Sequence, residues 1–320
     1  MSVLITGATG LIGKVITNLL HKHGYTVHYL TTRKNKIETR ENYKGYYWNP
    51  TKGEIDLASL VGVNYIINLA GATVSKRWTS HYKKEILNSR INSIRTLKSG
   101  IEKSSNTTIE GIVSASAIGI YPNSYDSLYT EDDKRVDDSF LGEVVAQWED
   151  EIDTLKELGC SVAKIRIGLV LSSKGGALPK MAQPIRNFVG AAFGSGEQWQ
   201  SWIHIKDLAR MFIFLMEKKQ SGVFNGVAPN PITNSKLTRE IATTLKKPLI
   251  LPNIPKVAMN LILGEMAYIL FSSQRVSSMK IEKRGFQFYH TNIKSALTDL
   301  LSDGKQEKSK TKTSLSEGYI

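Results

Sequence analysis

The stretch VLITGATGLIG, residues 3–13, decides the fold. A short apolar run leads into Gly7, Gly10 and Gly13, and an amphipathic stretch follows over residues 11–20. This order predicts a strand, a tight turn and a helix, in which glycines allow the turn, a close phosphate and close helix packing. A turn without a ligand is the alternative. We expect a dinucleotide pyrophosphate at the helix N-terminus, bound by Gly7, Thr9, Gly10, Leu11, Ile12 and Gly13.

Apolar runs and amphipathic segments alternate through the first two thirds of the chain. We expect strands at residues 2–6, 26–31, 65–68, 111–114, 161–167 and 222–225. Helices are expected at residues 11–23, 79–103, 142–158 and 205–217. The alternation predicts an α/β fold, a Rossmann-type doubly wound parallel sheet with helices on both faces. Ligands bind beyond the carboxyl ends of the strands in such sheets.

Prolines interrupt the sequence after Asn225 and divide it into short segments. We therefore expect a dinucleotide-binding Rossmann domain over residues 1–225 and a smaller, mostly helical C-terminal substrate lobe over residues 226–301. Residues 302–320 are rich in Lys, Ser and Thr, a composition typical of a disordered tail.

Composition limits the classes of protein to consider. With 41% hydrophobic and 22% charged residues, the chain has the composition of a globular protein. The single cysteine, Cys160, excludes an intrachain disulfide and the usual zinc motifs, so no metal site is expected. The longest apolar candidate for a membrane span, residues 257–271, is interrupted by Asn260 and Glu265. The first expected strand leaves no room ahead of it for a targeting peptide, so the expected location is cytoplasmic.

The formal net charge of +13 has two possible explanations, an anionic partner or ordinary solvated Lys and Arg side chains on the surface. Residues 73–103 hold eight Lys and Arg against two acids. No nucleic-acid-binding motif accompanies them, so we expect a basic rim around an anionic cofactor or substrate rather than a nucleic-acid site.

The end of the second expected strand indicates which dinucleotide binds. NAD proteins have an acid here that accepts hydrogen bonds from the ribose. In this chain Thr32 and Arg33 follow the strand, and no acid occurs before Glu38. Arg33 can bind a 2′-phosphate with its planar fork, and Thr32 can donate a hydroxyl. We expect NADP(H), with solvated loop residues as the alternative.

Two further segments are expected beside the dinucleotide. Leu69 and Ala70 follow the third expected strand, where small residues let the adenosine and ribose pass close to the backbone. A tight strand-to-loop turn is the alternative reading. Glu85 and Arg90 lie on the helix expected at residues 79–103, and surface ion pairing is the alternative for them.

Several segments, in order and spacing, resemble an atypical extended short-chain dehydrogenase/reductase of the epimerase family. Proteins of this kind are described as nucleoside-diphosphate-sugar-epimerase-like or cell-division-inhibitor-like. The matching segments include ITGATGLIG (5–13), INLAGA (67–72), SRINS (89–93), SASAIGIY (114–121), GSGEQWQSWIHIKDLA (194–209) and QRVSSMKIEKRGFQF (274–288). The resemblance implies NADP binding and makes a nucleotide sugar a candidate substrate. It also implies that Thr32 and Arg33 contact the adenosine phosphate, and that Leu69, Ala70, Glu85, Arg90 and Val170 lie along the cofactor.

The usual acid/base pair of this superfamily is missing. Its reaction uses a Tyr proton donor and a Lys four residues later, yet none of the thirteen Tyr residues has Lys at that spacing. Counting back from Glu149 places Leu141 and Val145 at the two positions, and neither side chain titrates. Ser116 and Tyr121 remain as candidate catalytic residues.

Two functions therefore stay open. The first is an NADP(H)-dependent oxidoreductase or epimerase-like enzyme that acts on an unidentified small molecule. The second is a non-catalytic NADPH-binding regulatory or sensor protein. The sequence identifies neither the substrate nor the oligomeric state.

Overall fold

The glycine-rich segment begins at the centre of the sheet. The computed structural model describes residues 1–104 and 108–302, so the expected tail from residue 303 onward lies outside the described residues. Strand β1 (Ser2–Thr6) pairs in parallel with β2 (Thr26–Thr31) on one side and with β6 (Tyr65–Asn68) on the other. The order in which the strands are added thus reverses at β1. In sheets of this kind a ligand-binding crevice is expected beyond the carboxyl ends of the strands at that point, here β1 and β6.

The complete sheet confirms the doubly wound arrangement. Its order within the described residues is β13-β9-β7-β6-β1-β2-β4-β3, with β5 paired to β4. Strands β13 to β4 are joined in parallel, whereas β3 and β5 pair antiparallel with β4. The remaining bounds are β3 Thr39–Arg40, β4 Tyr43–Asn49, β5 Glu54–Ile55, β7 Gly111–Ala117, β9 Ser161–Ile167 and β13 Gly222–Gly226.

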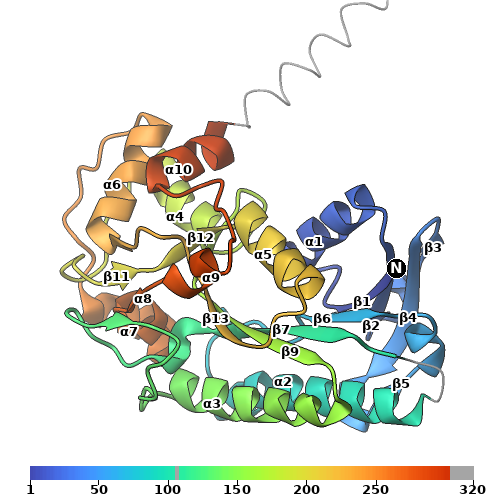
Figure 1. The fold of residues 1–320 in the computed structure, drawn as a ribbon. Helices are drawn as coiled ribbons and strands as arrows, with labels where there is room; N and C mark the ends of the chain where they lie inside the picture. Colours follow the sequence, from blue (N-terminus) through green and yellow to red (C-terminus); the bar gives the residue numbers. More distant parts are fainter. Residues whose placement is uncertain (105–107, 303–320) are drawn as a thin grey trace, which may run out of the picture.

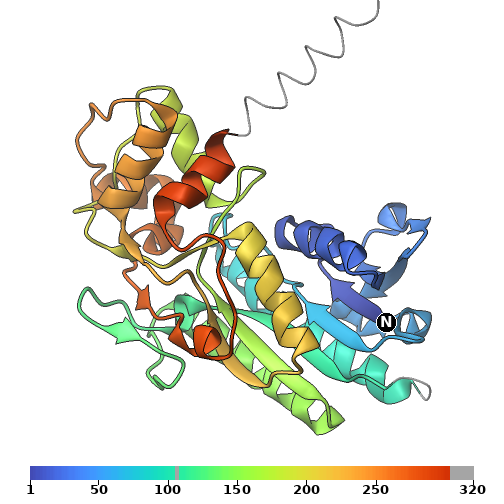
Figure 2. The same ribbon diagram turned by 45° about the horizontal axis from the view of Figure 1, so that its top comes forward.

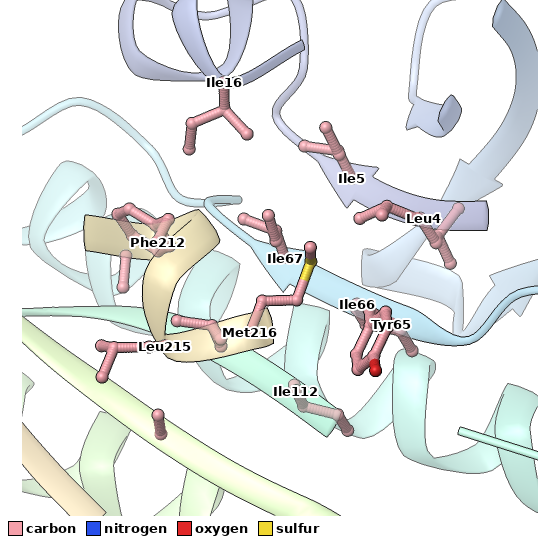
Figure 3. Close-up of a cluster of buried hydrophobic side chains, with 14 of the residues drawn as sticks. Leu4, Ile5, Ile16, Tyr65, Ile66, Ile67, Ile112, Phe212, Leu215 and Met216 are labelled. Atoms are coloured by element: carbon pink, nitrogen blue, oxygen red, sulfur yellow. The ribbon is translucent and has the colours of Figure 1, made fainter. Parts of the chain in front are cut away.

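Two pairs of helices cover the sheet. Helices α1 (Leu11–Lys22) and α5 (Ile205–Glu217) pack together on one face, and α2 (Ser80–Lys103) and α3 (Phe140–Asp153) pack together on the other (Figure 1). The helix expected at residues 142–158 ends at Asp153 and continues as a 3₁₀ helix, Thr154–Leu158. Figure 3 shows aliphatic side chains of β1 and β6 beside Ile16 of α1 and Phe212 of α5. Their burial fixes both helices against the sheet.

The C-terminal elements gather at one end of the molecule. Helices α4, α6 and α10 lie together there, far from β3 and β5 (Figures 1 and 2). They share a second apolar core with residues from two separate stretches, Leu171 to Trp202 and Ala228 to Leu300. The bounds of the remaining elements are β8 Leu128–Tyr129, β10 Leu169–Leu171, α4 Ala177–Arg186, β11 Trp199–Gln200, β12 Trp202–His204, β14 Ile232–Thr233, α6 Asn234–Leu245, α7 Lys256–Leu263, α8 Tyr268–Phe271, β15 Arg275–Val276, α9 Met279–Lys283 and α10 Ile293–Ser302. Helices of the length and apolarity needed to cross a bilayer do not occur in the described part.

Candidate functional site

The turn between β1 and α1 leaves backbone N–H groups available to an anion. Gly10 is the N-cap of α1 and provides no side-chain cap, so the first N–H groups of the helix are not occupied by a capping side chain. Gly7 has a φ of 72°, and a Cβ on Gly13 would lie 2.3 Å from the Gly7 carbonyl oxygen. Gly10 has a φ of −76°, so it needs no left-handed conformation. Gly7 is therefore the position in this turn where a residue with a side chain would be strained.

A buried polar chain aligns the carboxyl ends of three strands. The Thr6 hydroxyl donates to Asn68 Oδ1 at 2.7 Å, and Asn68 Nδ2 donates to Ser114 Oγ at 3.0 Å. Thr6 Oγ1 also accepts hydrogen bonds from the backbone N–H groups of Leu69 and Ala70, each at 3.0 Å. The loop after β6 is therefore held against the glycine-rich turn, where Leu69 lies within 3.2 Å of a Cβ placed on Gly7.

A cleft of about 690 Å³ extends from this turn to the C-terminal elements. Its lining combines the turn, the loop after β6, the end of β7, the face of α3 and the segment from Trp199 to Ser201. Tyr268 and Gln274 bound it on the C-terminal side. The cleft thus lies beyond the carboxyl ends of the strands, where doubly wound sheets bind ligands.

The cleft brings together nine of the residues singled out from the sequence. These are Gly7, Gly10, Leu11, Ile12, Gly13, Leu69, Arg90, Ser116 and Val170. The other six, Thr9, Thr32, Arg33, Ala70, Glu85 and Tyr121, are not among its lining residues. Glu85 is exposed on α2. Thr9 lines a neighbouring cavity of about 530 Å³ together with Lys14, Lys36 and Arg40.

Arg33 is an exposed cation just after β2. Its backbone N–H donates to Thr31 Oγ1 at 3.2 Å, and its guanidinium forms no ion pair with any residue that the structure describes. The nearest acid along the chain, Glu38, is already paired with Arg40 at 3.0 Å. The region therefore carries an uncompensated positive charge where NAD proteins have a carboxylate.

Arg90 supports the wall of the cleft. Its Nη1 donates to the carbonyl oxygens of Ala72 and Ile86, at 3.2 and 2.7 Å, and its guanidinium lies 5.0 Å from the centre of the Trp148 ring. Burial lowers the pKa of Arg90 to about 10, so the side chain is still charged at neutral pH. It fixes the loop after β6 against α2 and α3.

Ser116, at the end of β7, belongs to a buried charged cluster that the sequence did not indicate. Its hydroxyl donates to Glu149 Oε1 at 2.6 Å, and Arg166 donates to both oxygens of that carboxylate at 2.8 and 2.9 Å. Burial alone would raise the pKa of Glu149, but Arg166, Ser116 and Lys164 together hold that pKa below its ordinary value. Glu149 is therefore a carboxylate, and it accepts the Ser116 proton in a hydrogen bond.

Tyr121 lies behind this cluster rather than in the cleft. It is fully buried, its ring stacks on Tyr129, and its hydroxyl donates to Asn225 Oδ1 at 2.8 Å. Arg166 Nη1 donates to the same hydroxyl oxygen at 2.9 Å. Burial raises the pKa of Tyr121 to about 12. The Tyr121 hydroxyl is thus already hydrogen-bonded to Asn225 and Arg166.

Leu141 and Val145, which occupy the expected acid/base positions, both line the cleft. They lie one turn apart on α3, and both approach Gly119, within 4.0 Å of a Cβ placed there. Two aliphatic side chains thus stand on the wall where the usual reaction needs a phenol and an amine.

A separate cluster joins His204, His290 and Asp299 away from the cleft lining. The rings of the two histidines stack with centroids 3.8 Å apart. Asp299 Oδ2 already forms an ion pair with Lys206 Nζ at 3.0 Å. His204 Nδ1 accepts the backbone N–H of Lys206 and caps α5. Because His204 Nδ1 is an acceptor, Nε2 carries the ring proton and donates to Asp299 Oδ2 at 3.1 Å. The cluster therefore fits a structural joint between α5 and α10.

The fold and the glycine-rich turn define an extended short-chain dehydrogenase/reductase. A family model described as the NAD dependent epimerase/dehydratase family matches residues 3–146 and 152–227, and a domain of unknown function matches residues 254–300. The chain belongs to this epimerase family and is an atypical member of it, because it lacks the Tyr and Lys pair.

Known relatives support this assignment over nearly the whole chain. The epimerase family protein SAR0825 of Staphylococcus aureus is 38% identical over 300 residues, 93% of this chain and 98% of the relative. The crystal structure of human epimerase family protein SDR39U1 (isoform 2) with NADPH is 27% identical, with a TM-score of 0.81 over 94% of this chain and 99% of that one. MoeE5 in complex with UDP-glucose and NAD, 17% identical with a TM-score of 0.76 over 96% and 99% of the two chains, shares the fold. The chain is thus an NAD(P)-dependent epimerase-like protein with a nicotinamide cofactor.

Proposed function

We propose that this protein binds NADP(H) in preference to NAD(H) and is an oxidoreductase or epimerase-like enzyme acting on a small molecule in the cleft. The observation that carries the cofactor preference is Arg33, an exposed guanidinium without an ion-pair partner in the described residues, at the end of β2. A carboxylate in its place would repel a 2′-phosphate, whereas a guanidinium binds one with two parallel hydrogen bonds. The NADPH-bound relative supports the same choice.

The residues present fit a dinucleotide. The free N–H groups at the start of α1 would bind the pyrophosphate, and the open space beside Gly7 and Gly10 allows its close approach. Leu69, Ala70 and Val170 would lie along the cofactor, with Thr32 and Arg33 at the adenosine phosphate. Glu85, exposed on α2, is the candidate that the cleft geometry supports least. When bound, the nicotinamide supplies hydride transfer.

Ser116 is the proposed catalytic residue of this chain, and Tyr121 is given no chemical role because its hydroxyl is enclosed by Asn225 and Arg166. With its proton directed to Glu149, Ser116 Oγ presents lone pairs rather than a proton to the cleft. It therefore accepts a hydrogen bond from the hydroxyl that the substrate carries in its reduced form. A nucleotide sugar is the substrate class that the family resemblance suggests.

A second candidate function, NADPH binding without turnover, is favoured by Leu141 and Val145 on the cleft wall. General acid catalysis contributes about 10²–10⁴-fold to a rate, and these side chains supply none of it. The two functions share the cofactor site and differ only in turnover.

Two measurements test the proposal. Calorimetric titration with NADPH and NADH should give the lower dissociation constant for NADPH, and equal constants would contradict the cofactor assignment. Absorbance of NADPH at saturating cofactor, followed over a panel of carbonyl compounds, then separates the enzyme from the binding protein. Turnover that falls in Ser116→Ala favours the enzyme, whereas silence over the whole panel favours the binding protein.

A further inference from the structure

The cleft is poor in charge. Among the described residues that line it, Arg90 is the one side chain charged at neutral pH. Its Nη1 is already used by the carbonyl oxygens of Ala72 and Ile86. The N–H groups at the start of α1 would hold the cofactor's pyrophosphate, so a nucleoside-diphosphate substrate would bring two further negative charges into this space, and buried charge is costly unless it is paired. Arg275 stacks over the ring of Trp199 at 4.7 Å but does not line the cleft.

Most hydroxyl and amide groups of the cleft wall are turned toward protein partners. Ser116 donates to Glu149, Ser201 donates to the carbonyl oxygen of Gln274, and Tyr268 donates to the carboxylate of Asp137. Gln274 Nε2 in turn donates to the carbonyl oxygen of Tyr121. What these groups leave facing a ligand is mainly apolar surface.

Gln200 differs from these polar residues. It lies on β11, is half-buried and lines the cleft, and its side-chain amide makes no hydrogen bond within the described residues. Its neighbour Trp199 provides a flat aromatic surface in the same lining. Leu141, Val145 and Ile118, also in the lining, provide aliphatic surface. The Gln200 amide thus offers a partly exposed neutral hydrogen-bond donor beside an apolar wall, whereas Trp148 Nε1 and Ser272 Oγ of the same lining, unpartnered among the described residues, are buried.

We infer that the cleft takes an uncharged, flat, largely apolar carbonyl compound of the quinone type, oriented by the Gln200 amide, rather than a nucleoside-diphosphate sugar. This inference rests on the proposed function and names its substrate class. It also accounts for the missing acid. Hydride addition to an ordinary ketone gives an alkoxide, whose conjugate acid is almost as weak as water, so a proton donor is needed.

Hydride transfer to a quinone depends less on a proton donor in the protein. The quinone ring accepts one hydride, with both electrons, while the dihydronicotinamide is oxidised to the nicotinamide. The quinolate formed is a phenolate, whose conjugate acid has a pKa of about 10 like that of tyrosine, and it takes its proton from water to give the hydroquinone. A wall with Leu141 and Val145 in place of Tyr and Lys is compatible with this reaction and unsuited to sugar oxidation.

Binding to protein saturated with NADP⁺ tests the inference without turnover. The probes for calorimetry are 2,3-dimethyl-1,4-naphthoquinone, its 6-sulfonate and UDP-glucose; the methyl groups block addition of Cys160 to the ring. We expect the neutral quinone to bind at least tenfold more tightly than either charged probe. Gln200→Leu should weaken neutral quinone binding about fivefold, the effect of one hydrogen bond. Gln183→Leu, at an exposed position outside the cleft, is the matched control.

A second variant is designed to gain affinity, a result that a misfolded protein cannot produce. Leu141→Lys should raise affinity for the sulfonate several-fold relative to the neutral quinone, because it places a cation on the cleft wall. UDP-glucose binding as tightly as the quinone, or no quinone binding by protein that binds NADP⁺, would overturn the inference and leave the proposed cofactor function intact. Failure to bind NADP⁺ at all would overturn the proposed function itself.

Discussion

Ser116 and Glu149 are joined by a 2.6 Å hydrogen bond in which the hydroxyl is the donor and the carboxylate the acceptor. Arg166 holds the same carboxylate from its other side through two hydrogen bonds, at 2.8 and 2.9 Å. All three side chains are buried, and of the three Ser116 lines the cleft. The orientation of the one catalytic candidate is thus set by a buried ion pair behind the cleft wall.

Replacing Ser116 by Ala should lower any turnover without changing affinity for NADPH. The variant removes the hydroxyl at the end of β7 and leaves the glycine-rich turn and the end of β2 untouched. Steady-state rates and calorimetric NADPH titration measure the two effects separately. Turnover as fast as that of the wild type would show that Ser116 does not contact the reacting group.

Glu149→Gln should destabilise the protein by about 3–5 kcal/mol at pH 7, because it leaves the Arg166 charge buried without its counter-charge. The folded-state pKa of Glu149 is lowered below 4.5, so its stabilisation is present above that pH and is lost as the pH falls through the folded-state value. Urea unfolding at pH 7 and below pH 4 should therefore show a smaller difference between the two proteins at acid pH. Glu143→Gln, at an exposed position of the same helix, is the control.

Arg33→Ala should weaken NADPH binding roughly ten- to hundredfold, since a charge-assisted contact contributes about 1.5–3 kcal/mol. NADH has no 2′-phosphate, so its affinity should change little. Calorimetric titration of both cofactors on both proteins gives the comparison. An equal loss for NADH and NADPH would place Arg33 away from the 2′-phosphate.

Gly13→Ala should cost about 1–3 kcal/mol of stability and weaken dinucleotide binding. The added methyl group would lie 2.3 Å from the Gly7 carbonyl oxygen and 2.7 Å from Ala8 Cα, so the turn must shift. Gly175→Ala is the matched control because its Cβ would meet only Leu11, at 3.5 Å. Thermal unfolding and NADPH titration test both effects, and two variants of equal stability would argue against close packing at Gly13.

His204 should make the protein less stable in mild acid. Burial, together with the neighbouring His290, lowers its pKa from 6.5 to about 4. Between these values the unfolded chain binds a proton that the folded chain does not, so stability is lost as the pH falls from 6.5 toward 4, by about 3 kcal/mol at most. His204→Asn can still cap α5 and should reduce this loss in urea unfolding. His81→Asn, at an exposed position, should leave the pH dependence unchanged.

Local patterns in the sequence determined much of the fold. Strands β1, β2, β6 and β9 and helix α5 occur with the expected bounds, because apolar periodicity and flanking turn residues act over a few neighbours. The glycine-rich turn also formed where expected, between β1 and α1. The family resemblance added the overall class of the protein.

Strand β4 was not expected from the sequence, since Tyr43–Asn49 has no aliphatic residue and interposes Lys44 and Gly45. Its aromatic rings are buried by partners on another strand: Tyr43 stacks on Tyr29 of β2, and Tyr46 packs on His28. The sequence of β4 alone contains no sign of these partners. Strand formation here depends on the neighbouring strand.

The chemistry of the site was decided by contacts between distant residues. Ser116, Glu149 and Arg166 are separated by 33 and 17 positions, and no spacing rule connects a strand end, a helix and a neighbouring strand. The same holds for His204 and His290. The sequence by itself determined where a dinucleotide turn forms, because that turn is made by adjacent residues. Only the tertiary structure decided which side chains face the cleft and which are bound to one another behind it, because packing of sheet and helices fixes those directions.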